Sequence, residues 1–274
     1  MRMKKTYKFL SLALLAAIIS PAFISCTGSQ QKKEEKAAEE TIKKEIEEYA
    51  YPLPSTFEVT NMLNAIEASY IVGIANEPTK VDSYFTEKAK AVNLGIFTSD
   101  LAYATTYNQK PEIQAYFASC EKLVRELDFT SAFDENLPDQ IDANLDNKEK
   151  LVEIVTNMFQ NAYSYLNKQG RTELSYLVLT GSVVEGLYLT THISENTFQN
   201  PKILEAILFQ KNTLKDLESM MGKYAGSELL KEAYADIQAI NAIYAMEEGS
   251  TSMSEAQVTK LTETVSKIRA AYVQ

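Results

Sequence analysis

The stretch LSYLVLTGSVVEGLYLTTHI, residues 174–193, decides how this chain folds. It is the most apolar stretch downstream of the N-terminus, yet it contains two glycines, one glutamate and the only histidine of the chain. A helix that is apolar on all sides is buried on all sides. Thr180, Ser182 and Glu185 interrupt the apolar run, which makes insertion into a membrane unfavourable. We therefore predict a core helix whose glycines allow a neighbouring helix to approach closely.

The rest of the chain has the composition of an all-α protein. Only 9 glycines and 7 prolines punctuate it, and long amphipathic runs lie between them. No segment alternates between apolar and polar residues, as a strand would, over a convincing length. We expect about eight helices. Their predicted ranges are 55–77, 80–107, 111–127, 146–169, from 172 to about 193, 200–222, 227–247 and from 254 onward.

Start signals support several of these helices. Asp146 and Ser254 are followed three residues later by Glu149 and Gln257, which is the pattern of a capping box. Asn200 precedes a first-turn proline, and Gly170 is expected to end the fourth helix.

Two segments suggest an internal repeat. GIFTSDLAYATTY begins at Gly95 and GSVVEGLYLTTH at Gly181, and a leucine follows each glycine six residues later, at Leu101 and Leu187. The offset of about 86 residues also pairs the first predicted helix with the fourth, although chance similarity remains an alternative. We interpret the chain as two three-helix units followed by a C-terminal hairpin. A closed bundle and a TPR-like array of helical hairpins are both compatible with this interpretation.

The N-terminus resembles a bacterial export signal. Residues 1–25 combine a basic start with an apolar run that is too short to span a bilayer comfortably, and the run ends in FISC. That ending is similar to a lipoprotein signal box, in which Cys26 would be lipidated and become the first mature residue. An ordinary signal peptide with an incidental cysteine is the alternative. Residues 26–50 read as a lipid anchor with a charged tether, and residues 51–274 as a single helical domain.

The apolar repeat segments also carry a family resemblance. VNLGIFTSDLAYATTYNQ and LVLTGSVVEGLYLTTH, with the stretch between about Phe57 and Leu217, resemble uncharacterised all-helical lipoproteins of the Bacteroidota. The acid-rich KKEE after Cys26 is similar to the surface-export signals of such lipoproteins, and a plain solvated spacer explains it equally well. The resemblance implies the fold and an outer-membrane location, facing the periplasm or the cell surface. It supplies no catalytic residues.

Charge and cysteine content exclude several functions. The formal net charge is −10, which argues against nucleic acid and anionic lipid surfaces as partners. If Cys26 is acylated, Cys120 has no partner within the chain, so disulfide scaffolds and cysteine-rich metal sites are excluded.

The candidate polar site consists of residues near the two repeat segments. Asp100 and Glu185 are carboxylates on helices that should be buried, so they need partners and could form a polar site between the two units. Pairing with hydroxyl groups in the core, or exposure on a helix face, is the alternative. The lone His192 has no second histidine to share a metal ion and no nucleophile-elbow pattern, so we expect a structural role at a helix end.

Tyrosines complete the candidate site. The chain has 16 tyrosines and no tryptophan. Tyr103, Tyr107 and Tyr188 could line a groove, or they could be core residues whose hydroxyl groups reach helix ends. DANLDNKEKLVE, residues 142–153, imitates a calcium loop but lacks its glycine, so we predict no metal and no cofactor.

These observations predict a lipid-anchored outer-membrane protein that is not an enzyme. We expect it to bind an unknown protein partner or small-molecule ligand, with the membrane contacted through lipidated Cys26. The alternatives are a purely structural envelope lipoprotein and, less favoured, a hydrolase that uses carboxylates such as Asp100 and Glu185.

Overall fold

A computed structural model describes residues 60–65, 68–194, 197–245 and 252–274 of the chain. The predicted signal segment, Cys26 and the predicted charged tether lie outside the described residues. Within the described ranges every regular element is helical and none is a strand, which confirms the all-α fold. Residues 60–65 are helical, and the elements that follow are η1 (Pro78–Ser83), α3 (Glu87–Thr106), α4 (Lys110–Glu126), η2 (Thr130–Ala132), α5 (Leu137–Ala143), α6 (Lys148–Lys168), α7 (Thr172–His192), η3 (Thr197–Gln199), α8 (Pro201–Gly222), α9 (Lys231–Ile243) and α10 (Glu255–Tyr272).

Helices α3 and α7 form the centre of the fold and make its most extensive helix–helix contact. A Cβ atom added to Gly95 would lie 1.9 Å from the carbonyl oxygen of Val178, and one added to Gly181 would lie 1.9 Å from that of Val92. No side chain fits at either glycine unless the two backbones move apart. The close approach predicted from the sequence is therefore present, and it occurs twice.

The two close contacts are related by the proposed repeat. The same offset of about 86 residues relates Gly95 to Gly181 and Val92 to Val178, so the glycine of each helix meets the valine of the other. Leu101 and Leu187, which follow the glycines, are both 0% exposed. This exchange gives the repeat a physical meaning, because both helices bring the same glycine-centred surface to their crossing.

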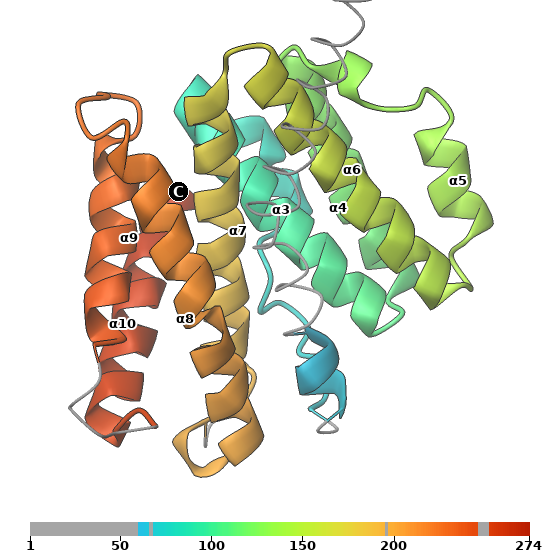
Figure 1. The fold of residues 1–274 in the computed structure, drawn as a ribbon. Coiled ribbons are helices and arrows are strands. Elements are labelled where there is room, and N and C mark those ends of the chain that lie inside the picture. The colour runs from blue at the N-terminus through green and yellow to red at the C-terminus, as the bar shows by residue number, and fades with distance from the viewer. Residues whose placement is uncertain (1–59, 66–67, 195–196, 246–251) are drawn as a thin grey trace, which may run out of the picture. The chain divides into compact units, whose positions relative to one another are not determined.

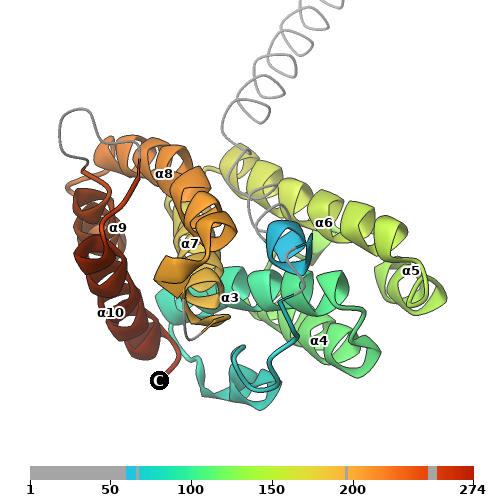
Figure 2. The ribbon, with the colours of Figure 1, turned by 90° about the horizontal axis from the view of Figure 1, so that it is seen from below.

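The remaining helices pack on both sides of this pair (Figures 1 and 2). Helices α4 and α6 pack on α3, and α6 also contacts α7. On the other side α8 and α10 pack on α7, and α9 packs on both α8 and α10 to form the C-terminal hairpin. None of the helices that the structure describes is both long and apolar enough to cross a membrane.

Local signals in the sequence explain most helix ends. The predicted capping box of Ser254 and Gln257 is formed, and the Asn200 side chain accepts hydrogen bonds from the backbone at the start of α8. Gly170, with φ of +71°, follows the end of α6 as predicted. The capping box predicted at Asp146 is wrong, because Asn147 is the N-cap residue and accepts from the Lys150 amide at 3.1 Å.

Several predicted boundaries are also wrong. Residues 68–77 form no helix, whereas the sequence predicted one as far as residue 77. The second predicted helix is broken between η1 and α3, where the Thr86 side chain caps α3. The acidic segment after α4 contains the short helix α5, and α9 begins at Lys231 rather than at Ser227.

Candidate functional site

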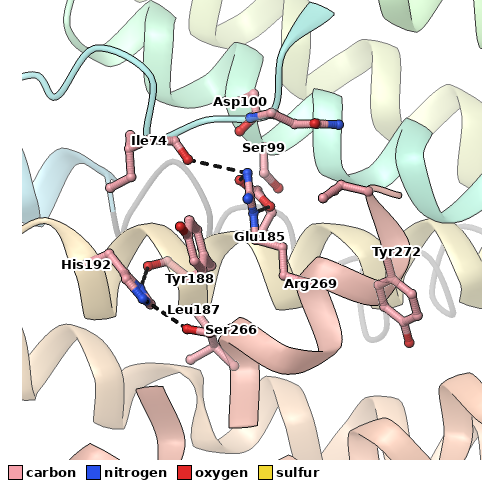
Figure 3. A network of polar contacts seen from close by, with 12 residues as sticks. Ile74, Ser99, Asp100, Glu185, Leu187, Tyr188, His192, Ser266, Arg269 and Tyr272 are labelled. Atoms are coloured by element: carbon pink, nitrogen blue, oxygen red, sulfur yellow. Dashed lines mark hydrogen bonds and ion pairs between the residues drawn. The ribbon is translucent and has the colours of Figure 1, made fainter. Parts of the chain in front are cut away.

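A buried ion pair joins the central helix α7 to the C-terminal helix α10 (Figure 3). Glu185 of α7 is 0% exposed, and Arg269 of α10 binds it with two hydrogen bonds. Nε of Arg269 donates to Oε2 of Glu185 at 2.6 Å, and Nη2 donates to Oε1 at 2.9 Å. Nη2 also donates to the carbonyl oxygen of Ile74 at 3.3 Å. Two-pronged binding of this kind fixes both position and orientation of the guanidinium.

Asp100 of α3 lies beside this pair and is also 0% exposed. Its Oδ2 accepts a hydrogen bond from the Asn76 amide at 3.2 Å, while Oδ1 has no donor within reach in the described part of the chain. Burial raises the pKa of Asp100 well above its ordinary value, and the charge of Glu185 raises it further. The positive charge of Arg269 lowers it, without reversing the direction of the shift.

The charges explain this shift. Two ionised carboxylates and one guanidinium would leave a net negative charge in a site that excludes water, which is strongly unfavourable. A proton kept on Asp100 makes the group neutral, and it would let Asp100 act as a donor to the neighbouring Glu185 carboxylate. Asp100, Glu185 and Arg269, here called the α10 clamp, therefore form a closed and neutral unit.

Tyr188 and His192 extend the α10 clamp along one side of α7. The guanidinium of Arg269 lies over the Tyr188 ring, with Cζ 4.0 Å from the ring centre, and the His192 ring stacks on the same tyrosine at 4.1 Å. A cation over an aromatic face is favourable, and more so when water is excluded.

The hydrogen bonds of His192 link the end of α7 to α10. Nδ1 lies 2.8 Å from the Tyr188 carbonyl oxygen, to which it donates, and Nε2 lies 3.0 Å from Oγ of Ser266 on α10. Burial lowers the pKa of His192 below its ordinary value. His192 is the last residue of α7 and links it to α10, as expected for a structural histidine at a helix end.

The other two candidate tyrosines lie at the C-terminal end of α3, Tyr103 within the helix and Tyr107 as its C-cap residue. Tyr103 stacks on Tyr70 with ring centres 4.8 Å apart, and Tyr107 meets Tyr103 edge-on at 5.0 Å. The Tyr103 hydroxyl accepts a hydrogen bond from the Ile71 amide at 2.9 Å. Burial raises the pKa of both Tyr103 and Tyr107. The six candidate residues thus separate into a group of four at the α10 clamp and an aromatic pair that lies one and two turns beyond Asp100.

The α10 clamp is well suited to hold helices together and poorly suited to act on a substrate. Neither carboxylate has exposed surface, and Arg269, whose side chain is 11% exposed, is committed to Glu185. Nearby, Nδ2 of Asn93 donates to the carbonyl oxygen of Tyr272 at 2.8 Å, and Nζ of Lys80 donates to that of Val273 at 3.2 Å. The end of α10 is therefore fixed to α3 and η1 by several independent bonds.

Arg269 is the member of the α10 clamp that sequence reasoning missed. A signal was available, because Arg269 follows Val265 by four residues and Ile268 by one, on the buried side of α10. A charged residue next to such an apolar stripe predicts a buried partner.

The carboxylates of the calcium-like segment, residues 142–153, are bonded to other side chains. Asp142 accepts from Gln114 at 2.8 Å, Asp146 pairs with Lys110, and Glu153 pairs with Lys150 at 2.9 Å. Among the residues that the structure describes, no three His, Cys, Asp or Glu side chains are grouped so that they could hold a metal ion.

A cleft between α4 and α6 differs in character from the α10 clamp. It has a volume of about 150 Å³ and is partly covered by the segment that leads into α5. Its lining residues are Phe117, Cys120, Glu121, Val124, Thr130, Phe133, Asp134, Glu135, Leu137, Pro138 and Met158. Burial raises the pKa of the Cys120 thiol to about 12, so this side chain stays neutral and forms part of an apolar floor. No pattern in the sequence predicted this cleft.

Comparison of the chain with protein-family models, with curated proteins and with solved structures gives no match.

Proposed function

We propose that this protein is a lipid-anchored outer-membrane protein whose helical domain binds a protein partner. The anchor is supported by the export signal ending in Cys26, and the location by the resemblance to lipoproteins of the Bacteroidota. The binding role is supported by the cleft between α4 and α6.

The cleft is the single observation that carries the binding role. Its floor is formed by apolar side chains that are nearly buried, among them Phe117 and Met158, each 7% exposed. Concave apolar surfaces with a few polar groups at the edge are the usual places where proteins bind ligands and peptide segments. A hollow between helices fits a projecting peptide segment of a partner protein better than it fits a flat partner surface.

The other two functions receive different support. A purely structural envelope role is favoured by the α10 clamp, in which the candidate polar groups are used to hold helices together. A hydrolase that uses Asp100 and Glu185 would have to expose both carboxylates, which are 0% exposed, and to release Glu185 from Arg269. We therefore propose no catalytic role for them.

Partner capture tests the binding role. The full-length protein, cross-linked in intact envelopes, is compared with Thr130→Trp, which places a large side chain at the exposed rim of the cleft. The matched control is Thr259→Trp, an exposed threonine on α10. We expect the wild type and Thr259→Trp to capture the same partner and Thr130→Trp to lose it. Equal capture by all three proteins, or no capture by any, would contradict binding at the cleft and favour the structural role.

Lipidation is tested separately. Cells that express the wild type or Cys26→Ala are supplied with labelled fatty acid and fractionated. We expect label on the wild type alone, and loss of its outer-membrane fraction in the variant. Protease treatment of intact cells then distinguishes a surface-facing domain from a periplasmic one. Equal labelling of Cys26→Ala would show that Cys26 is not the anchor.

A further inference from the structure

The cleft between α4 and α6 has room for one apolar side chain. A cavity of about 150 Å³, as an engineered example shows, is large enough for a benzene ring, and the cleft has about that volume. Val124, Cys120 and Met158 line it from α4 and α6, and Phe133 and Leu137 from the segment around η2 and α5. A leucine or phenylalanine side chain would fill this space, whereas a larger drug-sized ligand would not fit.

The charged residues at the rim are all acidic. Glu121, Asp134 and Glu135 line the cleft, and no lysine, arginine or histidine does. Asp134 accepts hydrogen bonds from Asn136 and Gln140, which are neutral and leave its charge uncompensated.

The charges of the other two acids are also little compensated by nearby cations. Glu121 has a single ion pair, with Arg125 at 3.5 Å, and that arginine side chain is 64% exposed. Glu135 makes no ion pair within the described ranges and is exposed. A negative rim around an apolar hole selects for positive charge beside the inserted group.

The covering segment has space on both of its sides. A second hollow, with a volume of about 210 Å³, lies between this segment and α6 and shares Phe133, Asp134, Leu137 and Met158 with the first. Helix α5 is held by Ile141, its one buried residue. The covering segment is therefore packed less tightly than the central helices.

We propose that the cleft between α4 and α6 binds a cationic peptide segment through one inserted leucine or phenylalanine side chain. This inference rests on the proposed function, because it names the partner chemistry of the same cleft. One apolar anchor in a pocket, with charged contacts around it, is a common way to concentrate binding energy and to select a partner.

Three synthetic peptides test both parts of the inference. Lys-Lys-Phe-Lys-Lys carries the anchor and the positive charge, Lys-Lys-Ala-Lys-Lys lacks the anchor, and Glu-Glu-Phe-Glu-Glu reverses the charge. Each is titrated into full-length protein labelled with ¹³C on the methionine methyl groups. The Met158 methyl reports the floor of the cleft, and the buried Met220, Met221 and Met253 are internal controls because they lie in α8 and next to α10.

We expect the first peptide to shift the Met158 resonance and to leave the three control resonances in place. The alanine and glutamate peptides should bind at least tenfold more weakly. Glu121→Gln/Glu135→Gln, two exposed changes that leave the apolar floor intact, should weaken binding of the first peptide about threefold or more and reduce its dependence on salt. Equal binding of the glutamate peptide would overturn the charge assignment, and equal binding of the alanine peptide would overturn the anchor.

Two further outcomes separate this inference from the proposed function. If none of the peptides shifts Met158 while partner capture remains sensitive to Thr130→Trp, the cleft is used but the cationic occupant is wrong. If capture is insensitive to Thr130→Trp as well, both the occupant and the cleft are wrong.

Discussion

The crossing of α3 and α7 and the cleft between α4 and α6 differ in what fills them. At the crossing, two backbones touch at Gly95 and Gly181, and the polar groups beside them form the buried α10 clamp. At the cleft, apolar side chains meet a hollow whose cover is a short helix with one buried residue. The glycines and buried charges that stand out in the sequence thus lie where the helices are held together. The cleft, in contrast, is lined mainly by apolar and acidic residues that do not stand out in the sequence.

The largest expected effect on stability comes from removing the charge of Arg269, which completes the α10 clamp. Arg269→Met leaves Glu185 buried without its counter-ion, and loss of one partner of a buried pair costs about 3 to 5 kcal/mol of unfolding free energy. The measurement is urea denaturation of the full-length protein followed by circular dichroism.

A double variant shows whether the loss is due to the unpaired charge. Arg269→Met/Glu185→Gln should be more stable than the sum of the two single changes predicts, because neither buried charge is then left alone. A loss below about 1 kcal/mol for Arg269→Met would show that the ion pair is a minor contact.

The second prediction concerns the helix crossing itself. Gly95→Ala or Gly181→Ala should each cost about 3 kcal/mol, because the added methyl group collides with a backbone carbonyl that cannot rotate away. Gly226→Ala is the matched control, since a Cβ there meets nothing within 4 Å. We expect this control to change stability by less than about 0.5 kcal/mol in the same denaturation experiment. Equal effects of the three substitutions would disprove the close approach.

The third prediction sharpens the contrast at the cleft. Ile141→Ala removes the one buried side chain of α5, so it should release that helix locally, at a cost of about 2 kcal/mol. Hydrogen exchange followed by mass spectrometry should show faster exchange in residues 137–143 and unchanged exchange in α3 and α7. Faster exchange throughout the central helices would mean that the cover and the core unfold together.

The smallest expected effect comes from the protonated carboxyl of the α10 clamp. Because the pKa of Asp100 is raised in the folded protein, the folded state binds the proton more tightly than the unfolded state does. Its contribution to stability is therefore fully present below the unfolded pKa, about 3.9, and is lost as the pH rises towards the folded value.

Asparagine can replace the protonated form, since it can accept from the Asn76 amide and donate to Glu185. Asp100→Asn should match the wild type near pH 4 and be more stable by about 1 kcal/mol or more at pH 7.5. Thermal unfolding at several pH values measures the difference. The opposite result would be that Asp100→Asn loses stability relative to the wild type as the pH rises from 4 to 7.5. That result would show that Asp100 is ionised in the folded protein.

The fold was largely predictable from the sequence because its central helices have an unmistakable composition. The apolar stretch around Gly181 and its counterpart around Gly95 predicted the buried pair, and the capping residues Asn200 and Ser254 predicted helix starts. The loop of residues 68–77 was not predictable in this way. Its path is set by distant groups, since Ile74 and Asn76 bind Arg269 and Asp100 across the fold.

The candidate site was predictable only in part, for a related reason. Burial of Asp100 and Glu185 followed from the apolar character of their helices, whereas their partner comes from α10, and no local pattern joins it to them. Tyr103 and Tyr107 follow Asp100 by three and seven residues and so lie on the same side of the chain, but further along it, where they pack with Tyr70 instead. The cleft forms only when α4, α6 and the segment around η2 and α5 come together, so no single stretch of sequence predicts it.

The span of the bond between Glu185 and Arg269 affects the order in which this protein can be assembled. A ribosome completes α3 and α7 well before it adds the arginine, which follows its glutamate by 84 positions. Until that helix emerges, Glu185 lacks its counter-ion, so the α10 clamp can form only after nearly the whole chain has been made.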